Sequence, residues 1–298
     1  MLLELIALIL AGIHFGIPLT YYLYLKSKYL NRPWNIKIDE NYKPKVTIII
    51  PTYREAKFIW KRLDNLYAQK YPKSLIEVII VDSKSDDGTI ELAREWTSKH
   101  PDLNVRLIEE DRRYGKLHAL QTALKEVDQD SEVIVFTDAD AFWEPNALSN
   151  ALSYFADPSV GSVTGSISYV VPMNCGRYLE NTYREFYNLI RVAESKKYAT
   201  PVHNGPFLAI RTNLLRKIGL PNYAGSDDSA FGSLIAFSGY RAIQADNVIV
   251  REPIRGSQIR RKIRRAQHLL LSFLKTRKYA KRIKVYRYIK SFEEIWKI

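Results

Sequence analysis

The sequence predicts an α/β protein in which a mostly parallel sheet is flanked by helices. Between residues 46 and 137, short runs rich in Val and Ile alternate with longer segments of helical pattern. Continuous apolar runs of this kind are typical of strands buried on both faces, and their alternation with helices indicates right-handed β-α-β units. A long apolar stretch precedes this region and a strongly basic stretch follows it. The predicted sheet therefore lies between two terminal segments of different character.

Residues 2–25 are almost entirely apolar and are predicted to form an N-terminal transmembrane helix. As a helix they would reach roughly 36 Å, enough to cross the hydrocarbon core of a bilayer. Interfacial tyrosines and then basic residues follow, at Tyr21, Tyr22, Tyr24, Lys26, Lys28 and Arg32. The positive-inside rule then favours a single-pass anchor in the cell membrane, with residues 26 onward in the cytoplasm. The alternative is a helix that lies on the membrane or packs on the domain.

The next elements follow in order along the chain. Residues 31–45 are polar, contain two prolines and are predicted to be a linker. Strands are expected at 46–50, 77–82, 105–108 and 133–137, and helices at 56–69, 89–99 and 116–127. The less regular region from 162 to 245 is expected to complete the same domain. The predicted organisation is an anchor over 1–30, the linker over 31–45, a domain over 46–250 and a basic arm over 251–298.

The charge of the chain is concentrated in the predicted arm. The net charge is +13, but residues 251–290 alone carry fifteen Lys and Arg against one acid, Glu252, so the rest is nearly neutral. Ile259, Ile263, Ala266 and Leu270 recur at helical spacing, which predicts a basic amphipathic helix on an anionic membrane. The alternative is a helix packed on the domain with a solvated basic face. A single cysteine excludes an internal disulfide and fits a reducing compartment.

Two carboxylates, Asp138 and Asp140, directly follow the apolar strand predicted at 133–137. Ligands of open α/β sheets bind at the carboxyl ends of the strands, and carboxylate oxygens suit a hard divalent cation. Asp82 closes another buried strand and is a candidate acceptor for a ring N–H of a nucleobase. Taken alone, an Asp-x-Asp pair is more often a solvated acidic turn, so the other motifs must decide.

Six ordered segments of the chain resemble the motif series of family 2 glycosyltransferases. They are residues 46–55, 81–89, 115–124, 136–140, 204–211 and 226–232. Members of that family have the GT-A fold, a nucleotide-binding α/β half joined to an acceptor half. The resemblance implies an inverting transfer from a nucleotide sugar, usually a UDP-sugar, with Mg²⁺ or Mn²⁺. The expected acceptor is lipid-linked or a polysaccharide, at the cytoplasmic face of the membrane.

The resemblance also implies a role for each matching residue. The nucleobase and ribose would be surrounded by Thr52, Tyr53, Glu55 and Asp82. Asp138 would reach the ribose and the metal, and Asp140 would bind the metal that bridges the diphosphate. Lys116 would approach the phosphates, while Asn204 and Gly205 would line the donor-sugar pocket. Asp228 falls where the family has its catalytic base, which must take a proton from the acceptor hydroxyl.

Two departures from the family pattern limit these expectations. Family members commonly carry two acids where this chain has Asp82 and Ser83. The Gln-x-x-Arg-Trp motif of processive polysaccharide synthases is replaced by a stretch at 258–267 without Trp. From this stretch, the resemblance implies that Arg261, Arg264 or Arg265 would contact the pyrophosphate.

Two other functions remain open from the sequence. A sugar-phosphate nucleotidyltransferase would carry a Gly-rich phosphate loop after its first strand, and none follows Ile50. A non-enzymatic basic membrane adaptor would have no use for Asp138, Asp140 and Asp228 together. Binding of nucleic acid is not expected, because few aromatic residues interleave with the basic ones.

Overall fold

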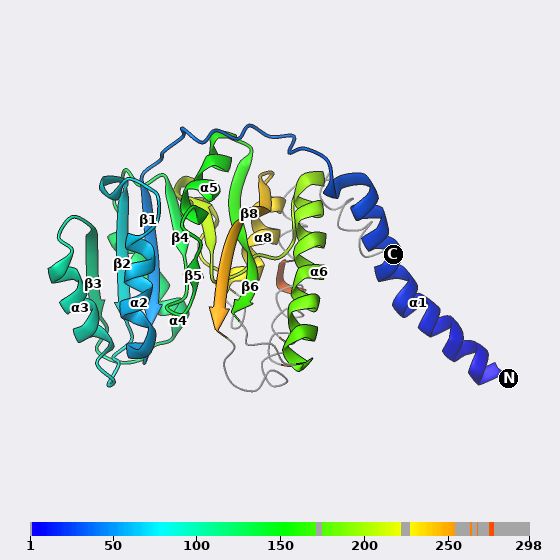
Figure 1. Ribbon diagram of the computed structural model, residues 1–298, viewed down its shortest axis with the longest axis horizontal. Coiled ribbons are helices and arrows are strands. Elements are labelled where there is room, and N and C mark those ends of the chain that lie inside the picture. The colour runs from blue at the N-terminus through cyan, green and yellow to red at the C-terminus, as the bar shows by residue number, and fades with distance from the viewer. Residues whose placement is uncertain are drawn as a thin grey trace.

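A computed structural model describes residues 2–170, 175–221, 227–253, 263, 267 and 274–276 of the chain. Eight described strands form a single sheet in the order β3-β2-β1-β4-β7-β6-β8-β5, with helices on both sides (Figure 1). A long helix, α1, projects away from this body.

The first half of the sheet is parallel, as predicted. Its strands are β1 (Val46–Thr52), β2 (Ile76–Asp82), β3 (Asn104–Glu109) and β4 (Val133–Phe136). The helices between them are α2 (Ala56–Tyr67), α3 (Thr89–Lys99) and α4 (Lys116–Glu126), and a 3₁₀ turn, η2 (Lys73–Leu75), precedes β2. Each predicted strand and helix of this region is present. Strand β1 continues past Ile50 because Pro51 and Thr52 still pair in register with Val81 and Asp82.

The second half makes the sheet mixed. It contains β5 (Phe142–Trp143), β6 (Val160–Val170), β7 (Leu208–Arg211) and β8 (Arg241–Pro253). Strand β7 is antiparallel to both β4 and β6, whereas β8 is parallel to β6 and antiparallel to β5. It follows that β4, β6 and β8 all end at the edge where β7 begins. This edge also receives the ends of β1 and β2 and is called the carboxyl edge below.

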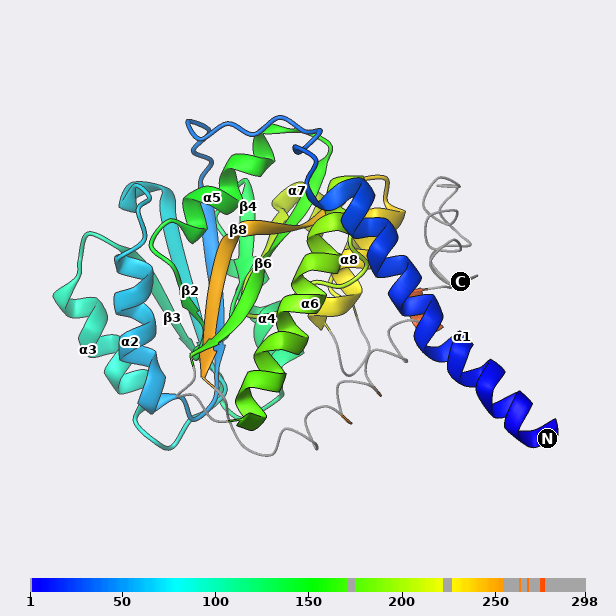
Figure 2. The ribbon, with the colours of Figure 1, turned by 45° about the vertical axis from the view of Figure 1, so that its right-hand side comes forward.

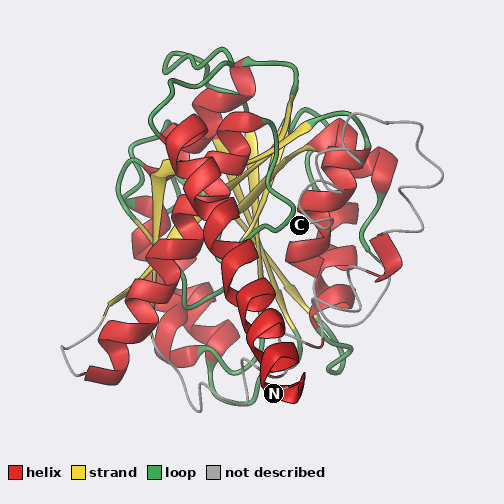
Figure 3. Ribbon diagram, turned by 90° about the vertical axis from the view of Figure 1, so that its right-hand side faces the viewer, coloured by secondary structure: helices red, strands yellow, loops and turns green. Residues whose placement is uncertain are grey.

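Helices cover both faces of the sheet (Figure 3). Residues of α2, α3 and α5 (Ala147–Ser153) pack on one face, and residues of α4, α7 (Thr212–Ile218) and α8 (Asp227–Phe237) pack on the other. The 3₁₀ turn η3 (Tyr154–Ala156) follows α5. In β1 the side chains of Ile48 and Ile50 belong to the first core and that of Ile49 to the second, all fully buried. Burial on both faces explains why these strands have continuous apolar sequences.

The N-terminal residues form the predicted helix, α1 (Leu2–Leu25), which continues as a π-helical turn, η1 (Lys26–Leu30). Among the described residues this is the helix long and apolar enough to cross a membrane. Its most apolar window has a mean hydropathy of 2.1, and none of that window is buried. Leu3 and Leu8 are 81% and 75% exposed. Most of α1 extends away from the rest of the domain (Figure 2).

The end of α1 is fixed to the domain through α6 (Cys175–Lys197), which packs on β6 and β8. Leu25 is buried, and the Tyr21 hydroxyl donates to Glu194 Oε1 at 2.7 Å. Burial raises the pKa of Glu194 above its usual range, and the hydrogen bonds from Tyr21 and Thr200 oppose that shift. Lys196 Nζ donates to the carbonyl oxygen of Leu30 at 2.7 Å. These contacts set the direction in which α1 leaves the domain.

The predicted linker has no helix or strand, yet it follows the surface of the domain closely (Figure 1). The Asp39 amide donates to the carbonyl of Ser153, and the Lys37 amide donates to Asp157 Oδ2 at 2.9 Å. The ring of Trp34 lies edge-on to Tyr154, with the ring centroids 5.3 Å apart. The linker is therefore an ordered connection, held to the domain surface, between the N-terminal helix and β1.

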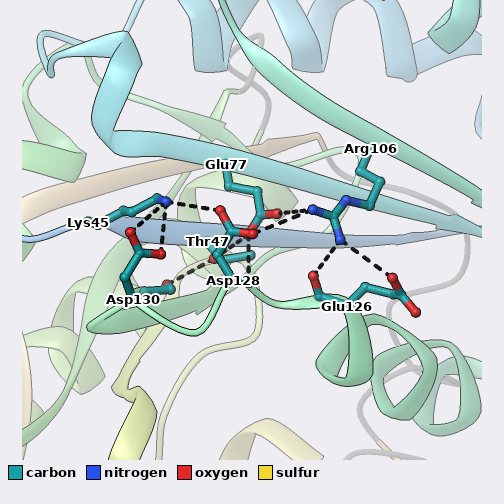
Figure 4. Close-up of polar contacts among 8 residues, drawn as sticks. Lys45, Thr47, Glu77, Arg106, Glu126, Asp128 and Asp130 are labelled. Carbon is teal, nitrogen blue, oxygen red and sulfur yellow. Dashed lines mark hydrogen bonds and ion pairs between the residues drawn. The ribbon is translucent and has the colours of Figure 1, made fainter.

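A network of charged side chains lies at the amino ends of the first four strands, opposite the carboxyl edge (Figure 4). Glu77 is fully buried and accepts a hydrogen bond from Thr47 Oγ1 at 2.7 Å, and Arg106 pairs with it at 3.1 Å. Lys45 pairs with both Asp128, at 3.0 Å, and Asp130, at 2.8 Å. The buried Glu77 carboxylate is thus both hydrogen-bonded and paired, and removing one of its partners would leave a buried charge uncompensated.

Candidate active site

Three carboxylates meet at the carboxyl edge: Asp138, Asp140 and Glu252. One oxygen from each lies within 4.8 Å of the others. Asp138 and Asp140 stand in the turn between β4 and β5, and Glu252 stands near the end of β8. Pairing of Phe142 with Arg251 brings the two segments together.

The sequence predicts the two aspartates as metal ligands but does not predict the third carboxylate, Glu252, which the structure places beside them. The available signal is weak: Glu252 is the lone acid at the start of the basic arm, and Arg251 separates it from the apolar run that ends at Val250. Its position beside the aspartates depends on the pairing of β5 with β8, two strands that lie more than 100 residues apart in the chain. Only the fold supplies that information.

The donor set of this carboxylate triad suits a divalent cation. Carboxylate oxygens are hard ligands, which Mg²⁺ and Mn²⁺ bind in preference to nitrogen and sulfur ligands. Lys116 Nζ, at the start of α4, lies 2.8 Å from Asp138 Oδ1 and offsets part of the negative charge. A cation held here would face the space beyond the strand ends, where a diphosphate would bind.

The turn that carries the aspartates is tied to its surroundings at both ends. Thr137 Oγ1 and Trp143 Nε1 both donate to the carbonyl of Pro206, at 2.8 and 3.0 Å. Asn65 of α2 pairs with the backbone of Trp143, accepting from its N–H and donating to its C=O, both at 2.8 Å. The turn is therefore a preorganised support for ligands.

Asn204, predicted to line the donor-sugar pocket, lies in the loop that enters β7 and is 7% exposed. Its Oδ1 accepts from Arg191 Nη1 at 2.7 Å, and its Nδ2 donates to the carbonyl of Gly165 at 3.0 Å. Asn204 and Gly205 precede Pro206, whose carbonyl accepts hydrogen bonds from Thr137 and Trp143 at the two ends of the turn that carries Asp138 and Asp140. Asn204 is held by these internal bonds, so its structural role is established and a ligand role remains a prediction.

Asp228 lies in the first turn of α8, and its side chain is outside the described residues. Helix α8 packs tightly on the segment that leads to Asn204. A Cβ added to Gly232 would lie 2.7 Å from the carbonyl oxygen of Pro201, and Ser233 Oγ donates to the same carbonyl at 3.1 Å. The helix that carries Asp228 is thus anchored to the loop containing the predicted pocket residue.

The residues predicted to hold the nucleobase gather at the ends of β1 and β2. Asp82 is fully buried, and its Oδ1 accepts from Thr52 Oγ1 at 2.8 Å and from Ser85 Oγ at 2.7 Å. Its Oδ2 accepts from the Ser85 amide at 2.7 Å. In this arrangement Asp82 shapes the loop after β2, and only Oδ2 keeps substantial capacity for another donor.

Tyr53 and Glu55 stand in the neighbouring loop after β1. The Arg113 guanidinium lies 4.0 Å from the centroid of the Tyr53 ring, and both residues reach the surface at this edge. Glu55 precedes α2, and its amide donates to Thr89 Oγ1 at 2.9 Å, which joins the two loops.

The same two loops contain backbone strain. Arg54 and Lys84 have φ angles of 57° and 56°, the left-handed region that side chains rarely adopt. The Arg54 amide donates to Ser85 Oγ at 2.8 Å, so the strained positions support each other. Such strain clusters at functional sites. The other predicted phosphate contacts, Arg261, Arg264 and Arg265, lie outside the described residues.

His203, next to Asn204, gives the stability of this region a pH dependence. It is buried, its Nε2 lies 2.6 Å from Ser162 Oγ, and burial, with the nearby Arg191, lowers its pKa to about 3. The unfolded chain, with a His pKa near 6.5, binds a proton that the folded chain rejects. The free energy of unfolding should therefore fall by up to about 1.4 kcal/mol per pH unit as the pH drops from 6.5 toward 3.

Chemical denaturation between pH 7 and pH 4.5 would measure this effect. We expect His203→Gln to have a shallower slope than the parent protein, whereas His100→Gln should keep the parent slope. Equal slopes for the parent and His203→Gln would mean that His203 does not contribute to the pH dependence of the free energy of unfolding.

Comparisons with known proteins give a consistent result. Residues 47–219 match the model of the Glycosyl transferase family 2. The chain is 30% identical over 215 residues to glycosyltransferase AglE of Haloferax volcanii, an alignment that covers 71% of this chain and 68% of AglE.

A second relative and a solved structure extend the comparison. Dolichyl N-acetyl-alpha-D-glucosaminyl phosphate 3-beta-D-2,3-diacetamido-2,3-dideoxy-beta-D-glucuronosyltransferase of Methanococcus voltae is 29% identical over 54% of this chain, but the alignment spans only 46% of that relative. The mannosyltransferase PcManGT from Pyrobaculum calidifontis, in complex with GDP-Man and Mn²⁺, superimposes with a TM-score of 0.82 and 43% identity. That match covers 93% of this chain and 76% of PcManGT.

Proposed function

The chain belongs to glycosyl transferase family 2, and on that premise we propose that it transfers mannose from GDP-mannose to a lipid-linked acceptor at a membrane surface. The observation that carries the proposal is the carboxylate triad of Asp138, Asp140 and Glu252 at the carboxyl edge. It occurs in a chain that shares 43% identity with a mannosyltransferase bound to GDP-mannose and Mn²⁺. The lipid-linked acceptor is supported by the name of the Methanococcus voltae relative.

The choice of GDP-mannose departs from the donor that the sequence motifs favour. Family 2 motifs by themselves imply a UDP-sugar as the usual donor. The solved structure with the high identity and coverage carries GDP-mannose instead, which favours a guanine nucleotide for this chain. A UDP-sugar is therefore the alternative donor, and the test below separates the two.

In the proposed inverting transfer, different residues bind the metal, contact the diphosphate and accept the proton. Asp138, Asp140 and Glu252 would hold Mg²⁺ or Mn²⁺, which when bound offsets negative charge on the leaving diphosphate. Lys116 adds a fixed positive charge beside Asp138. Arg261, Arg264 and Arg265 are proposed to reach the pyrophosphate from the basic arm. Asp228 is proposed to take the proton from the acceptor hydroxyl as it attacks the anomeric carbon.

A donor panel tests the proposed function. Purified protein is incubated with Mn²⁺ and, separately, GDP-mannose, UDP-glucose or UDP-N-acetylglucosamine, each with a short polyprenyl phosphate as acceptor. We expect release of GDP and mannosylated lipid from GDP-mannose at least tenfold faster than any release of UDP. If only a UDP-sugar is turned over, the donor is a UDP-sugar, as the sequence motifs imply, and the GDP-mannose proposal is wrong. Lack of transfer from every donor would overturn the lipid acceptor.

The membrane contacts can be tested without activity. We propose that α1 spans the bilayer, that the domain is cytoplasmic, and that the basic arm over 251–298 binds anionic lipid. A chain lacking residues 2–19 keeps Tyr21 and Leu25 in their docked positions. It should bind vesicles rich in phosphatidylglycerol at low salt and leave them at high salt, since each Lys or Arg near the surface contributes about 1 kcal/mol that salt screens.

Neutral vesicles are the control for this experiment, and the shortened chain should not bind them. The full-length protein should remain membrane-bound at high salt. If the shortened chain binds equally well at low and high salt, the basic arm does not bind the membrane through electrostatic attraction.

A further inference from the structure

Arg62 is a fully buried arginine directly behind the metal-binding turn. It lies on α2 with 0% exposure. Its Nη2 donates to Thr137 Oγ1 at 2.9 Å, its Nη1 donates to Asn65 Oδ1 at 2.8 Å, and its guanidinium lies 4.2 Å from the centroid of the Trp143 ring. Thr137 and Trp143 flank the turn that carries Asp138 and Asp140. Arg62 therefore contacts both ends of that turn.

The guanidinium has no carboxylate bonded to it among the residues that the structure describes. Its printed partners are a neutral hydroxyl and a neutral amide, and its buried Nε has no hydrogen-bond partner within the described part of the chain. Burial lowers the pKa of Arg62 to about 9, and the field of Asp138 and Asp140 opposes that shift. A buried charge without a bonded counter-ion is costly and calls for a compensating field. The carboxylates of the metal site supply it.

We propose that Arg62 is a positioning residue that keeps the carboxylate triad assembled without metal and weakens its affinity for a metal that arrives alone. A fixed positive charge behind Asp138 and Asp140 offsets part of the repulsion within the triad, so the carboxylates can stay close together. The same charge repels a divalent cation. A diphosphate adds negative charge on the open side and restores the attraction, so metal and donor would bind as one unit.

Replacing Arg62 with an uncharged residue would have two opposing effects on metal affinity. One is a local loss of hydrogen bonding, and the other is a longer-range loss of charge repulsion. Arg62→Met keeps the length of the side chain but loses the positive charge, the hydrogen bonds to Thr137 Oγ1 and Asn65 Oδ1, and the guanidinium contact with the Trp143 ring. The lost hydrogen bonds loosen the turn locally, which disfavours metal binding. The lost charge acts on a doubly charged ion through a low-dielectric interior, where Coulomb interactions are strong. The charge effect should therefore win, and the variant should bind metal more tightly.

The test is Mn²⁺ binding to the full chain without nucleotide, followed by the electron paramagnetic resonance signal of free Mn²⁺. We expect Arg62→Met to bind Mn²⁺ about tenfold more tightly than the parent, equivalent to about 1.4 kcal/mol. Arg62→Lys keeps the charge and should stay within about twofold of the parent. A purely structural tie would give weaker binding in both variants, and that result, or unchanged binding in Arg62→Met, overturns the proposal.

Arg241 provides a matched control. It is also buried, at 5% exposure, it also has a buried Nε without a partner in the described part of the chain, and it also stacks on an aromatic ring, that of Tyr198 at 5.1 Å. It begins β8, at the end of the strand away from Glu252. Arg241→Met should leave Mn²⁺ affinity unchanged.

The inference rests on the metal site of the proposed function, and Asp140→Asn separates the two. If Asp140→Asn binds Mn²⁺ as the parent does, the metal site itself is wrong. If Asp140→Asn loses Mn²⁺ but Arg62→Met equals the parent, only the role of Arg62 is wrong. Thermal unfolding of each variant checks that it is folded at the temperature of the binding measurement.

Discussion

Asp228→Asn protein is expected to transfer sugar about 10²–10⁴-fold more slowly than the parent, the usual contribution of a general base. Asparagine keeps the size and hydrogen-bonding reach of the side chain but cannot accept the acceptor's proton. The proposed base stands on α8, a different element from the turn that carries Asp138 and Asp140. That separation suits an inverting displacement, because the acceptor must approach opposite the leaving nucleotide diphosphate.

Donor binding distinguishes loss of the base from loss of the site. Calorimetry of GDP binding with Mn²⁺ should give nearly the same affinity for Asp228→Asn and the parent, since the proposed nucleotide and metal ligands are intact. Asp227→Asn is the neighbouring control and should lose much less activity. Comparable losses in both variants would leave the base unassigned. Full activity in Asp228→Asn would mean that another group takes the proton.

Asp140→Asn is expected to weaken Mn²⁺-dependent binding of the nucleotide diphosphate at least about 100-fold. Loss of groups that merely support a metal ligand typically costs 10–100-fold, and here a ligand itself loses its charge. The carboxylate triad would be left with two negative charges in place of three. Calorimetry of GDP binding in Mn²⁺ and in EDTA measures the change, and the variant should resemble the parent in EDTA.

Two further variants sharpen this prediction. Glu252→Gln should weaken binding in the same direction if the third oxygen belongs to the metal site. Asp130→Asn, at the opposite end of the sheet in the network with Lys45, should bind GDP and Mn²⁺ like the parent. Equal GDP affinity of the parent in Mn²⁺ and in EDTA would remove the cation from the mechanism.

The first half of the sheet could be predicted from the sequence because its signals are local. The buried strands β1, β2 and β4 have continuous apolar sequences, and α3 begins and ends where predicted, at Thr89 and Lys99. The second half could not be predicted in the same way. Strand β6 contains small and polar residues such as Ser162, Thr164 and Gly165, whose environment depends on partners far along the chain.

The same distinction applies to the site. Asp138 and Asp140 were identified because they directly follow a strand, whereas Glu252 joins them only through the pairing of β5 with β8. The internal bonds of Asp82 were also unpredictable, because Ser85 reaches back to it through a loop with a left-handed residue, Lys84. The docking of Tyr21 on Glu194 joins residues 173 positions apart and leaves no local pattern in either segment.

The fixed junction between α1 and α6 has a consequence for how the enzyme would meet its acceptor. The free end of α1 points to the same side of the molecule as the carboxyl ends of β1 and β8 (Figures 1 and 2). If α1 lies in a bilayer, the carboxyl edge of the sheet faces the lipid headgroups, and the junction of α1 with α6 fixes its distance from them. An isoprenoid acceptor would then be found by lateral diffusion in two dimensions, and its phosphate would arrive already oriented toward the enzyme.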